Sequence, residues 1–135
     1  MSAIGNHTKA VPDVPTSDEF TKTVGLVTWL MSMSEPYCDM PISSFEKKVF
    51  APLMLKQVRV FYKRKQPVAV LIWAYASKEV QSKLNAGGYE MRIADWRSGP
   101  EVVVVDCISP FADQDIVVES FMAEVAAAEA ATSNR

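Results

Sequence analysis

The chain has 135 residues, of which 49% are hydrophobic, and a formal net charge of -2. This length suits one domain, and the hydrophobic content is sufficient for a buried core. The longest uncharged apolar run, 66–77, is too short to cross a bilayer. The N-terminus lacks a basic segment followed by an apolar block, so we expect no secretory signal. Together these features favour a cytoplasmic protein without a membrane span.

The beginning of the chain predicts a disordered arm followed by a helix. Residues 1–15 contain Gly5, Pro12 and Pro15 and little apolar periodicity, which is typical of a disordered N-terminal arm. A single domain is expected over 16–131, followed by a frayed tail at 132–135. Thr16 to Glu19 has the spacing of a capping box. Apolar residues then recur at helical intervals, which predicts a helix at about 17–33.

A loop and a second helix follow. The segment 34–41 has two prolines and no periodicity, which predicts a restricted loop. Ser43 to Glu46 has the spacing of a second capping box, and Phe45, Val49 and Leu53 mark the inner face of a second helix. Pro52 is expected to bend or end this helix because it has no backbone N–H to donate.

The second half of the chain predicts a sheet with further helices. Two segments, 58–62 and 68–75, are rich in β-branched and aromatic residues and are joined by polar residues, which indicates a β-hairpin. Ser77 caps a short helix that ends before Gly87, and 89–96 is expected to end in an extended piece. The valine-rich segment 101–108 predicts a strand buried on both faces and hence central in the sheet. A last helix, capped by Asp113 or Asp115, is predicted at about 115–130.

The charges are sorted along the chain. Seven cationic side chains and no acidic one occur between residues 47 and 65, whereas seven acids follow residue 100 against a single arginine. This asymmetry is consistent with a positive surface for an acidic partner, and also with a solvated helix and hairpin tip. The cations are Lys47, Lys48, Lys56, Arg59, Lys63, Arg64 and Lys65.

Four sequence segments together resemble a known family. They are Thr28-Trp29-Leu30, then Pro67-Val68-Ala69 with Trp73-Ala74, then Asp95-Trp96-Arg97-Ser98-Gly99-Pro100, and finally Ser109-Pro110-Phe111-Ala112-Asp113 after the predicted strand. From about Val24 to about Val125 the pattern resembles the toxin-activating lysine acyltransferases, which fatty-acylate RTX haemolysins. The resemblance implies an α+β, GNAT-like acyltransferase fold, with a small, mostly antiparallel sheet flanked by helices. Periodicity by itself indicates only α+β.

The resemblance also implies candidate site residues. Asp95 matches the aspartate of the family's Asp-Trp turn, which is taken to act in catalysis. The family's histidine lies four residues before the proline that opens the second helix, and here that position is Tyr37, since the single histidine of the sequence is His7. A tyrosine is a poor general base at neutral pH but can donate a proton to a departing thiolate. The adjacent Cys38 is a candidate nucleophile for an acyl thioester.

The implied acyl donor is a carrier protein. None of the five glycines forms the glycine-rich loop that would hold the pyrophosphate of coenzyme A. The family takes acyl chains from acyl carrier protein, so the expected co-substrate is a phosphopantetheine thioester, docked on the seven cations above. The expected acceptor is a lysine of an RTX-type toxin or another protein. We expect no bound cofactor, no metal site and no nucleic-acid partner.

Two other functions stay open at this stage. The chain is either an active enzyme or a catalytically inactive relative that binds an acyl chain, acyl carrier protein or another protein, because tyrosine stands at the histidine position. A structural oligomerisation module is a third reading. The family usually continues beyond the last predicted helix, which here would leave an exposed sheet edge, so a homodimer is expected.

Overall fold

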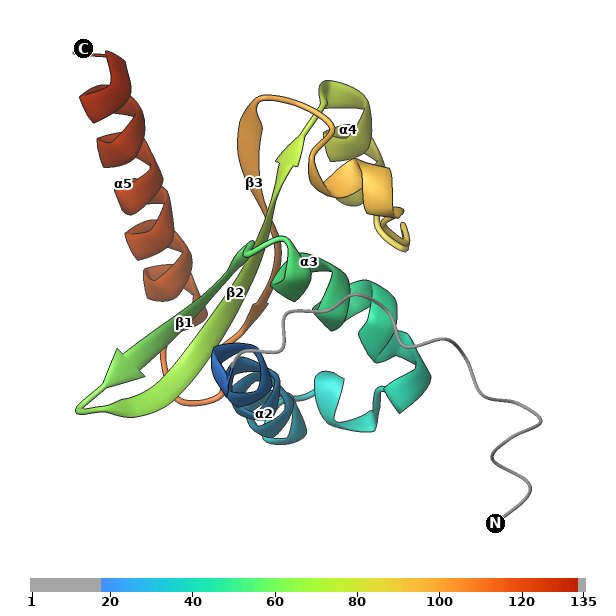
Figure 1. The fold of residues 1–135 in the computed structure, drawn as a ribbon, viewed down its shortest axis with the longest axis vertical. Helices are drawn as coiled ribbons and strands as arrows, with labels where there is room; N and C mark the ends of the chain where they lie inside the picture. Colours follow the sequence, from blue (N-terminus) through green and yellow to red (C-terminus); the bar gives the residue numbers. More distant parts are fainter. Residues whose placement is uncertain (1–17, 134–135) are drawn as a thin grey trace.

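The computed structural model describes residues 18–133, which fold around a three-stranded antiparallel sheet (Figure 1). The strands β1 (Val58–Lys63), β2 (Gln66–Ala76) and β3 (Glu101–Ile108) are arranged in the order β1-β2-β3. The predicted arm at 1–15 lies outside the described residues. The α+β class and the small antiparallel sheet are confirmed, and the fold is compatible with a GNAT-like domain.

Helices occupy both faces of this sheet. The α-helices are α2 (Asp18–Ser32), α3 (Ala51–Met54), α4 (Lys78–Ala86) and α5 (Gln114–Ser133). Short 3₁₀ turns are η1 (Tyr37–Asp39), η2 (Ile42–Ser44) and η4 (Ile93–Trp96), and η3 (Glu46–Phe50) is a π-helical turn. Helix α5 lies on one side of the sheet, and the other helices lie on the opposite side (Figure 1).

The alternation of side chains along β2 separates two hydrophobic cores. Val70 and Ile72 belong to the larger core, which contains the buried residues of α2, η3, α3 and α4. Ala69 and Leu71 face the opposite way and pack in the smaller core with residues of α5, including Phe121. Because successive side chains of a strand point to opposite faces, both faces of β2 are covered. This accounts for the burial of residues 69–72, 74 and 76 of the strand.

Several predicted ends of elements are confirmed by their hydrogen bonds and backbone angles. The Val80 N–H donates to Oγ of Ser77, so Ser77 caps α4, and Gly87 ends the helix with φ of 82°. Oδ1 of Asp113 accepts from the backbone N–H of Asp115 at 2.9 Å at the start of α5. The β1–β2 turn has positive φ at both central residues, as tight hairpins of this twist require.

The position of β3 differs from the prediction. We expected this valine-rich strand at the centre of the sheet, but among the described residues it is an edge strand and β2 is central. Its apolar run reflects burial on both faces, since residues of β3 pack in both cores. The valine-rich composition of β3 therefore reflects packing against both of its faces. It does not indicate a neighbouring strand on each side.

The second helix also differs from the prediction. The capping box at 43–46 does not form, because neither η2 nor η3 has a side-chain cap. Instead the Ala51 N–H donates to the carbonyl of Glu46, five residues back, which widens the turn. Pro52 explains this geometry: it has no N–H to donate to the carbonyl of Lys48. The α-helix resumes only with Pro52 near its first position.

Two smaller differences concern where predicted elements end. The segment 89–96 was expected to end in an extended piece, but it ends in the 3₁₀ turn η4. Helix α5 extends to Ser133, beyond the predicted end at 130, because its alanines favour helix.

Among residues 18–133 there is no helix both long and apolar enough to cross a membrane.

Candidate active site

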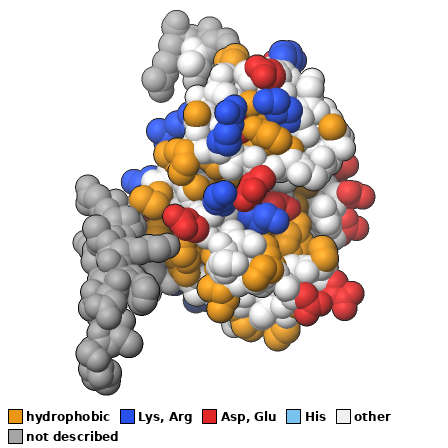
Figure 2. Space-filling model, turned by 90° about the vertical axis from the view of Figure 1, so that its right-hand side faces the viewer, with side chains coloured by type: hydrophobic (Ala, Val, Ile, Leu, Met, Phe, Trp, Pro, Cys, Tyr) orange, Lys and Arg blue, Asp and Glu red, His pale blue; other side chains and the backbone are white. Residues whose placement is uncertain are grey.

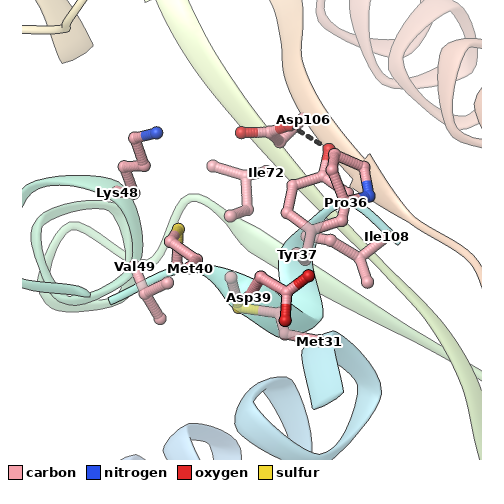
Figure 3. A pocket seen from close by; sticks show the side chains of 10 residues that line it. All are labelled: Met31, Pro36, Tyr37, Asp39, Met40, Lys48, Val49, Ile72, Asp106 and Ile108. Carbon is pink, nitrogen blue, oxygen red and sulfur yellow. Dashed lines mark hydrogen bonds between the residues drawn. The ribbon is translucent and has the colours of Figure 1, made fainter. Parts of the chain in front are cut away.

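The best-defined candidate site is a cavity of about 330 Å³ between the helical layer and the sheet (Figure 3). Its wall comes from the end of α2, the loop with η1, the π-helical turn η3, and strands β2 and β3. Most of the lining is aliphatic, with polar groups from Tyr37, Asp39, Lys48 and Asp106. The lining residues are Met31, Pro36, Tyr37, Asp39, Met40, Lys48, Val49, Ile72, Asp106 and Ile108.

Tyr37 and Asp106 form the central polar contact of this cavity. The Tyr37 hydroxyl donates to Oδ1 of Asp106 at 2.5 Å, as the dashed line in Figure 3 shows. The two residues are 69 positions apart in the chain. The fold therefore brings the loop before the second helix against the last strand, and a tyrosine and a carboxylate meet in the wall of the cavity.

A β-bulge orients Asp106 toward this cavity. Ile72 of β2 pairs with Asp106, but the next residue, Trp73, pairs with Val104, so Val105 is the extra residue. In a regular strand Val105 and Asp106 would point to opposite faces. Both line the same neighbouring cavity, which shows that the bulge has turned them to one side. Bulges commonly redirect a side chain beside functional sites.

A second cavity of about 220 Å³ adjoins the first. The two share the residues Lys48 and Asp106, so these two side chains lie at the boundary between the cavities. The second cavity is more polar and aromatic than the first. Its lining residues are Lys47, Lys48, Leu84, Gly88, Tyr89, Glu90, Met91, Trp96, Val105 and Asp106.

Burial determines the protonation of the groups at this site. Burial raises the pKa of Asp106, and the hydrogen bond from Tyr37 and the charge of Lys48 only partly oppose this rise. Burial, with the hydrogen bond to Asp106 and its charge, raises the pKa of Tyr37 far above neutral, so the phenol stays protonated. Burial and the charge of Asp106 raise the pKa of the Cys107 thiol to about 11, which makes a thiolate unfavourable.

Asp95 lies elsewhere, in the turn before β3. Its side chain is 3% exposed and does not line either cavity. One carboxylate oxygen accepts from the Arg92 backbone N–H at 2.9 Å and from the Tyr89 hydroxyl. Burial raises the pKa of Asp95, but these bonds and the Arg92 charge outweigh it and the net pKa is lowered. The Tyr89 hydroxyl therefore links the Asp95 carboxylate to the second cavity, which Tyr89 lines, and the catalytic role of Asp95 stays a prediction from the resemblance.

The Asp-Trp turn as a whole is held by a clamp centred on Gln57, which is 1% exposed. The Gln57 side chain donates to the carbonyls of Trp73 and Trp96, at 3.1 and 3.0 Å, and accepts from Arg97 at 2.9 Å. The Ser98 N–H donates to the Tyr75 carbonyl at 2.8 Å. These bonds join the turn to the end of β2 and to the entrance of β1, so the motif has a clear structural role.

Cys38 is exposed and lines neither cavity, although it follows Tyr37 directly. Its role as a nucleophile stays a prediction. Among residues 18–133 there is no group of three or more His, Cys, Asp or Glu side chains that could hold a metal ion. His7 lies outside the described residues.

The seven predicted docking cations are spread over η3, the residues after α3, strand β1 and the β1–β2 turn. Lys47 pairs with Glu90 at 3.3 Å, and Arg59 pairs with Glu124 of α5 at 3.1 Å. The turn between β1 and β2, which carries Arg64 and Lys65, lies at the opposite end of the molecule from α4 (Figure 1). On the face seen in Figure 2, basic side chains occur in separate groups among acidic and hydrophobic ones. Carrier docking on these cations stays a prediction.

Sequence reasoning missed Asp106 as a site residue and placed Lys48 on a docking surface only. A signal for Asp106 was present, because it is the single charged residue in the otherwise apolar run from Val102 to Ile108. A charged side chain in a strand buried on both faces needs a partner. No sequence pattern indicated that Tyr37 is that partner.

An antiparallel sheet, a helical layer and a tyrosine–carboxylate pair in a mostly aliphatic cavity are compatible with a GNAT-like acyltransferase domain. Comparison with known families agrees: residues 16–134 match the family model described as the HlyC RTX toxin acyltransferase family. The chain belongs to this family.

Three individual relatives are similar to this chain at 24–28% sequence identity. The chain is 26% identical over 102 residues to the protein-lysine myristoyltransferase RtxC of Kingella kingae, a match that covers 76% of this chain and 60% of the relative. It is 28% identical over 99 residues to the RTX-III toxin-activating lysine-acyltransferase ApxIIC of Actinobacillus pleuropneumoniae, covering 73% and 57%. It is also 24% identical over 106 residues to the uncharacterized protein sll0720 of Synechocystis, covering 71% and 72%. The chain thus spans about three fifths of the length of the first two relatives.

Proposed function

We propose that this chain is a cytoplasmic protein-lysine acyltransferase that moves a fatty acyl group from acyl carrier protein to a lysine of an RTX-type toxin or similar protein. The observation that carries the proposal is the Tyr37–Asp106 hydrogen bond in the wall of a mostly aliphatic cavity. Family membership supports the reaction class, and the names of two relatives describe a lysine myristoyltransferase and a toxin-activating lysine acyltransferase.

Asp106 is the proposed proton acceptor. A lysine side chain has a pKa of about 10.4 and attacks a thioester only as the neutral amine. The raised pKa of Asp106 brings its carboxylate closer to the range in which a general base works near neutral pH. The amine nitrogen bonds to the acyl carbon, the carbon–sulfur bond breaks, and the thiolate leaves. One ammonium proton passes to Asp106 before the attack, and the second N–H proton passes to solvent water as the intermediate collapses to the amide and the thiolate.

Tyr37 is proposed to position Asp106. The resemblance suggested a proton donor, but the raised pKa of the phenol makes it a weak acid toward a thiolate, whose conjugate acid has a pKa of about 8.5. A leaving thiolate does not require protonation at neutral pH. The hydroxyl instead fixes the orientation of the carboxylate by its hydrogen bond at 2.5 Å.

The aliphatic part of the first cavity is proposed to hold the acyl chain near its thioester end. Met31, Met40, Val49, Ile72 and Ile108 supply this surface. Acyl carrier protein is the proposed donor, and its acidic surface is complementary to the cations of 47–65 that remain outside the two ion pairs described above. A homodimer that pairs a free sheet edge is a further proposal, since β1 and β3 are both edge strands among the described residues.

The experiment that tests the function is acyl transfer from myristoyl-acyl carrier protein to an RTX toxin fragment, measured by mass spectrometry. We expect transfer by the native chain, loss of transfer in Asp106→Ala, and reduced transfer in Tyr37→Phe. Asp115→Ala, an exposed aspartate of α5, is the matched control. Transfer by Asp106→Ala at the native rate would contradict the proposed role of the cavity.

An inactive, acyl-binding relative is the second candidate function. The observation that favours it is Tyr37 at the position of the family histidine, because its raised pKa prevents action as a base at neutral pH. The variant Tyr37→His distinguishes the two functions. If the native chain binds acyl carrier protein but transfers nothing, and Tyr37→His transfers, the native chain is a binder whose site lacks only the base.

A further inference from the structure

We infer that Lys48 is a further catalytic residue of the proposed site, whose ammonium stabilises the oxyanion formed when the acceptor amine attacks the thioester. The inference rests on the proposed function and adds a residue to it. Sequence reasoning assigned Lys48, with six other cations, to a docking surface. Its place in the structure separates it from them, because it lines both cavities beside Asp106.

The position of Lys48 follows from the π-helical turn η3. Three successive residues of this turn face three different environments. Lys47 lines only the second of the two cavities, with its side chain 63% exposed and paired with Glu90, whereas Val49 is 0% exposed in the larger core. Lys48 lies between them, at the boundary of the two cavities. π-helical turns are frequent at functional sites, and here Pro52 accounts for the widened turn.

The Lys48 ammonium is available for a ligand. Figure 3 shows its side chain extended along the cavity wall toward the level of the Asp106 carboxylate, with Tyr37 on the far side of that carboxylate. Within the described part of the chain, no carboxylate oxygen lies within 4.0 Å of Nζ of Lys48 and no hydrogen bond engages it. Its charge nevertheless reaches Asp106, since it lowers the pKa of that carboxyl against the effect of burial.

This arrangement matches the charges that develop during acyl transfer. When the amine nitrogen bonds to the acyl carbon, an electron pair moves to the carbonyl oxygen, and that pair returns when the carbon–sulfur bond breaks. In the inferred arrangement Asp106 takes the proton of the amine, and Lys48, beside it at the boundary of the two cavities, contacts the oxygen that gains charge. A cation at the oxyanion acts mainly on the transition state, so it raises kcat and leaves KM little changed.

The test compares steady-state acyl transfer by the native chain, Lys48→Met, Lys48→Arg, the neighbouring Lys47→Met and the control Lys22→Met, which changes an exposed lysine of α2 away from both cavities. We expect a fall in kcat of about 10²-fold or more in Lys48→Met with little change in KM, as found when one oxyanion donor is removed. Lys48→Arg should recover part of kcat, and the control Lys22→Met should retain the native kcat. Because Lys48 is exposed at the surface of the turn, the variants should fold normally.

A second measurement does not depend on turnover. The Asp106 carboxyl, followed by NMR in native and Lys48→Met protein, should titrate at higher pH once the cation is gone. An unchanged titration, or native kcat in Lys48→Met, would overturn the inference while leaving the proposed function intact. A native chain that transfers no acyl group would overturn the proposed function, and the role of Lys48 in transfer would fail with it. A KM effect shared by Lys47→Met would assign both lysines to carrier docking instead.

Discussion

Replacing Asp95 with alanine should lower stability and leave activity in place. Replacing Asp106 with alanine should abolish activity and leave stability nearly unchanged. Asp95 is 3% exposed, and its carboxylate accepts from the Arg92 N–H and the Tyr89 hydroxyl. Asp106 is partly buried and has one hydrogen bond, from Tyr37. We therefore expect Asp95→Ala to lower the free energy of unfolding and Asp106→Ala to abolish acyl transfer.

The magnitudes follow from these contacts. A hydrogen bond to a charged group contributes about 1.5–3 kcal/mol, so the loss of two at Asp95 should cost about 3 kcal/mol. The Arg92 ion pair at 3.6 Å adds little, because the arginine side chain is 73% exposed. For a chain of this size 3 kcal/mol lowers Tm by roughly 10 °C. Asp106→Ala should change stability by about 1 kcal/mol or less, because the raised pKa shows that folding disfavours its ionised form.

The assay combines urea unfolding with acyl transfer at a temperature where both variants are folded. Asp95→Ala should be less stable but should retain transfer, whereas Asp106→Ala should be stable and inactive. The reasoning is refuted if folded Asp95→Ala loses acyl transfer while Asp106→Ala keeps it. That result would identify Asp95, in the Asp-Trp turn, as the catalytic carboxylate.

Three further predictions concern stability. Gly99→Ala should be strongly destabilising, because its Cβ would lie 2.5 Å from the backbone nitrogen of Ser77, whereas the control Gly25→Ala in helix α2 should gain up to about 1 kcal/mol in urea unfolding. Lys65→Gly should raise Tm, since its φ of 68° costs a non-glycine residue roughly 1 kcal/mol; no gain in calorimetry would contradict this. Because the pKa of Asp95 is lowered in the folded protein, its carboxylate stabilises the fold at pH values above the unfolded-state pKa of about 3.9. That stabilisation is lost as the pH falls through the folded-state pKa. The stability difference between native protein and Asp95→Asn should therefore narrow at acid pH, and a constant difference would count against it.

Much of the fold was predictable because local signals and tertiary packing agree. Ser77 and Gly87 bound α4 for reasons of capping and backbone conformation that operate within a few residues. The hairpin was similarly marked by its strand residues and polar turn. Sheet order was not predictable in this way: the valines of β3 report covered faces, and they carry no information about which strand is at an edge.

The candidate site was harder to predict because its parts are distant in sequence. The resemblance pointed to Tyr37, which lies in the wall of the first cavity, but nothing local to Tyr37 identifies Asp106 as its partner. The bulge at Val105 is also a property of strand pairing and has no marker in the sequence. Asp95 attracted attention through its motif, and the structure shows that much of this motif consists of residues that hold the turn.

The Gln57 clamp has a consequence for the order of folding. Its bonds connect positions 16 and 40 residues apart in the chain, so they form only after two long loops have closed. Loop closure costs entropy before any contact compensates for it. We therefore expect the Gln57 hydrogen bonds to form after the folding transition state. Substitution of Gln57 should then accelerate unfolding and leave the refolding rate nearly unchanged.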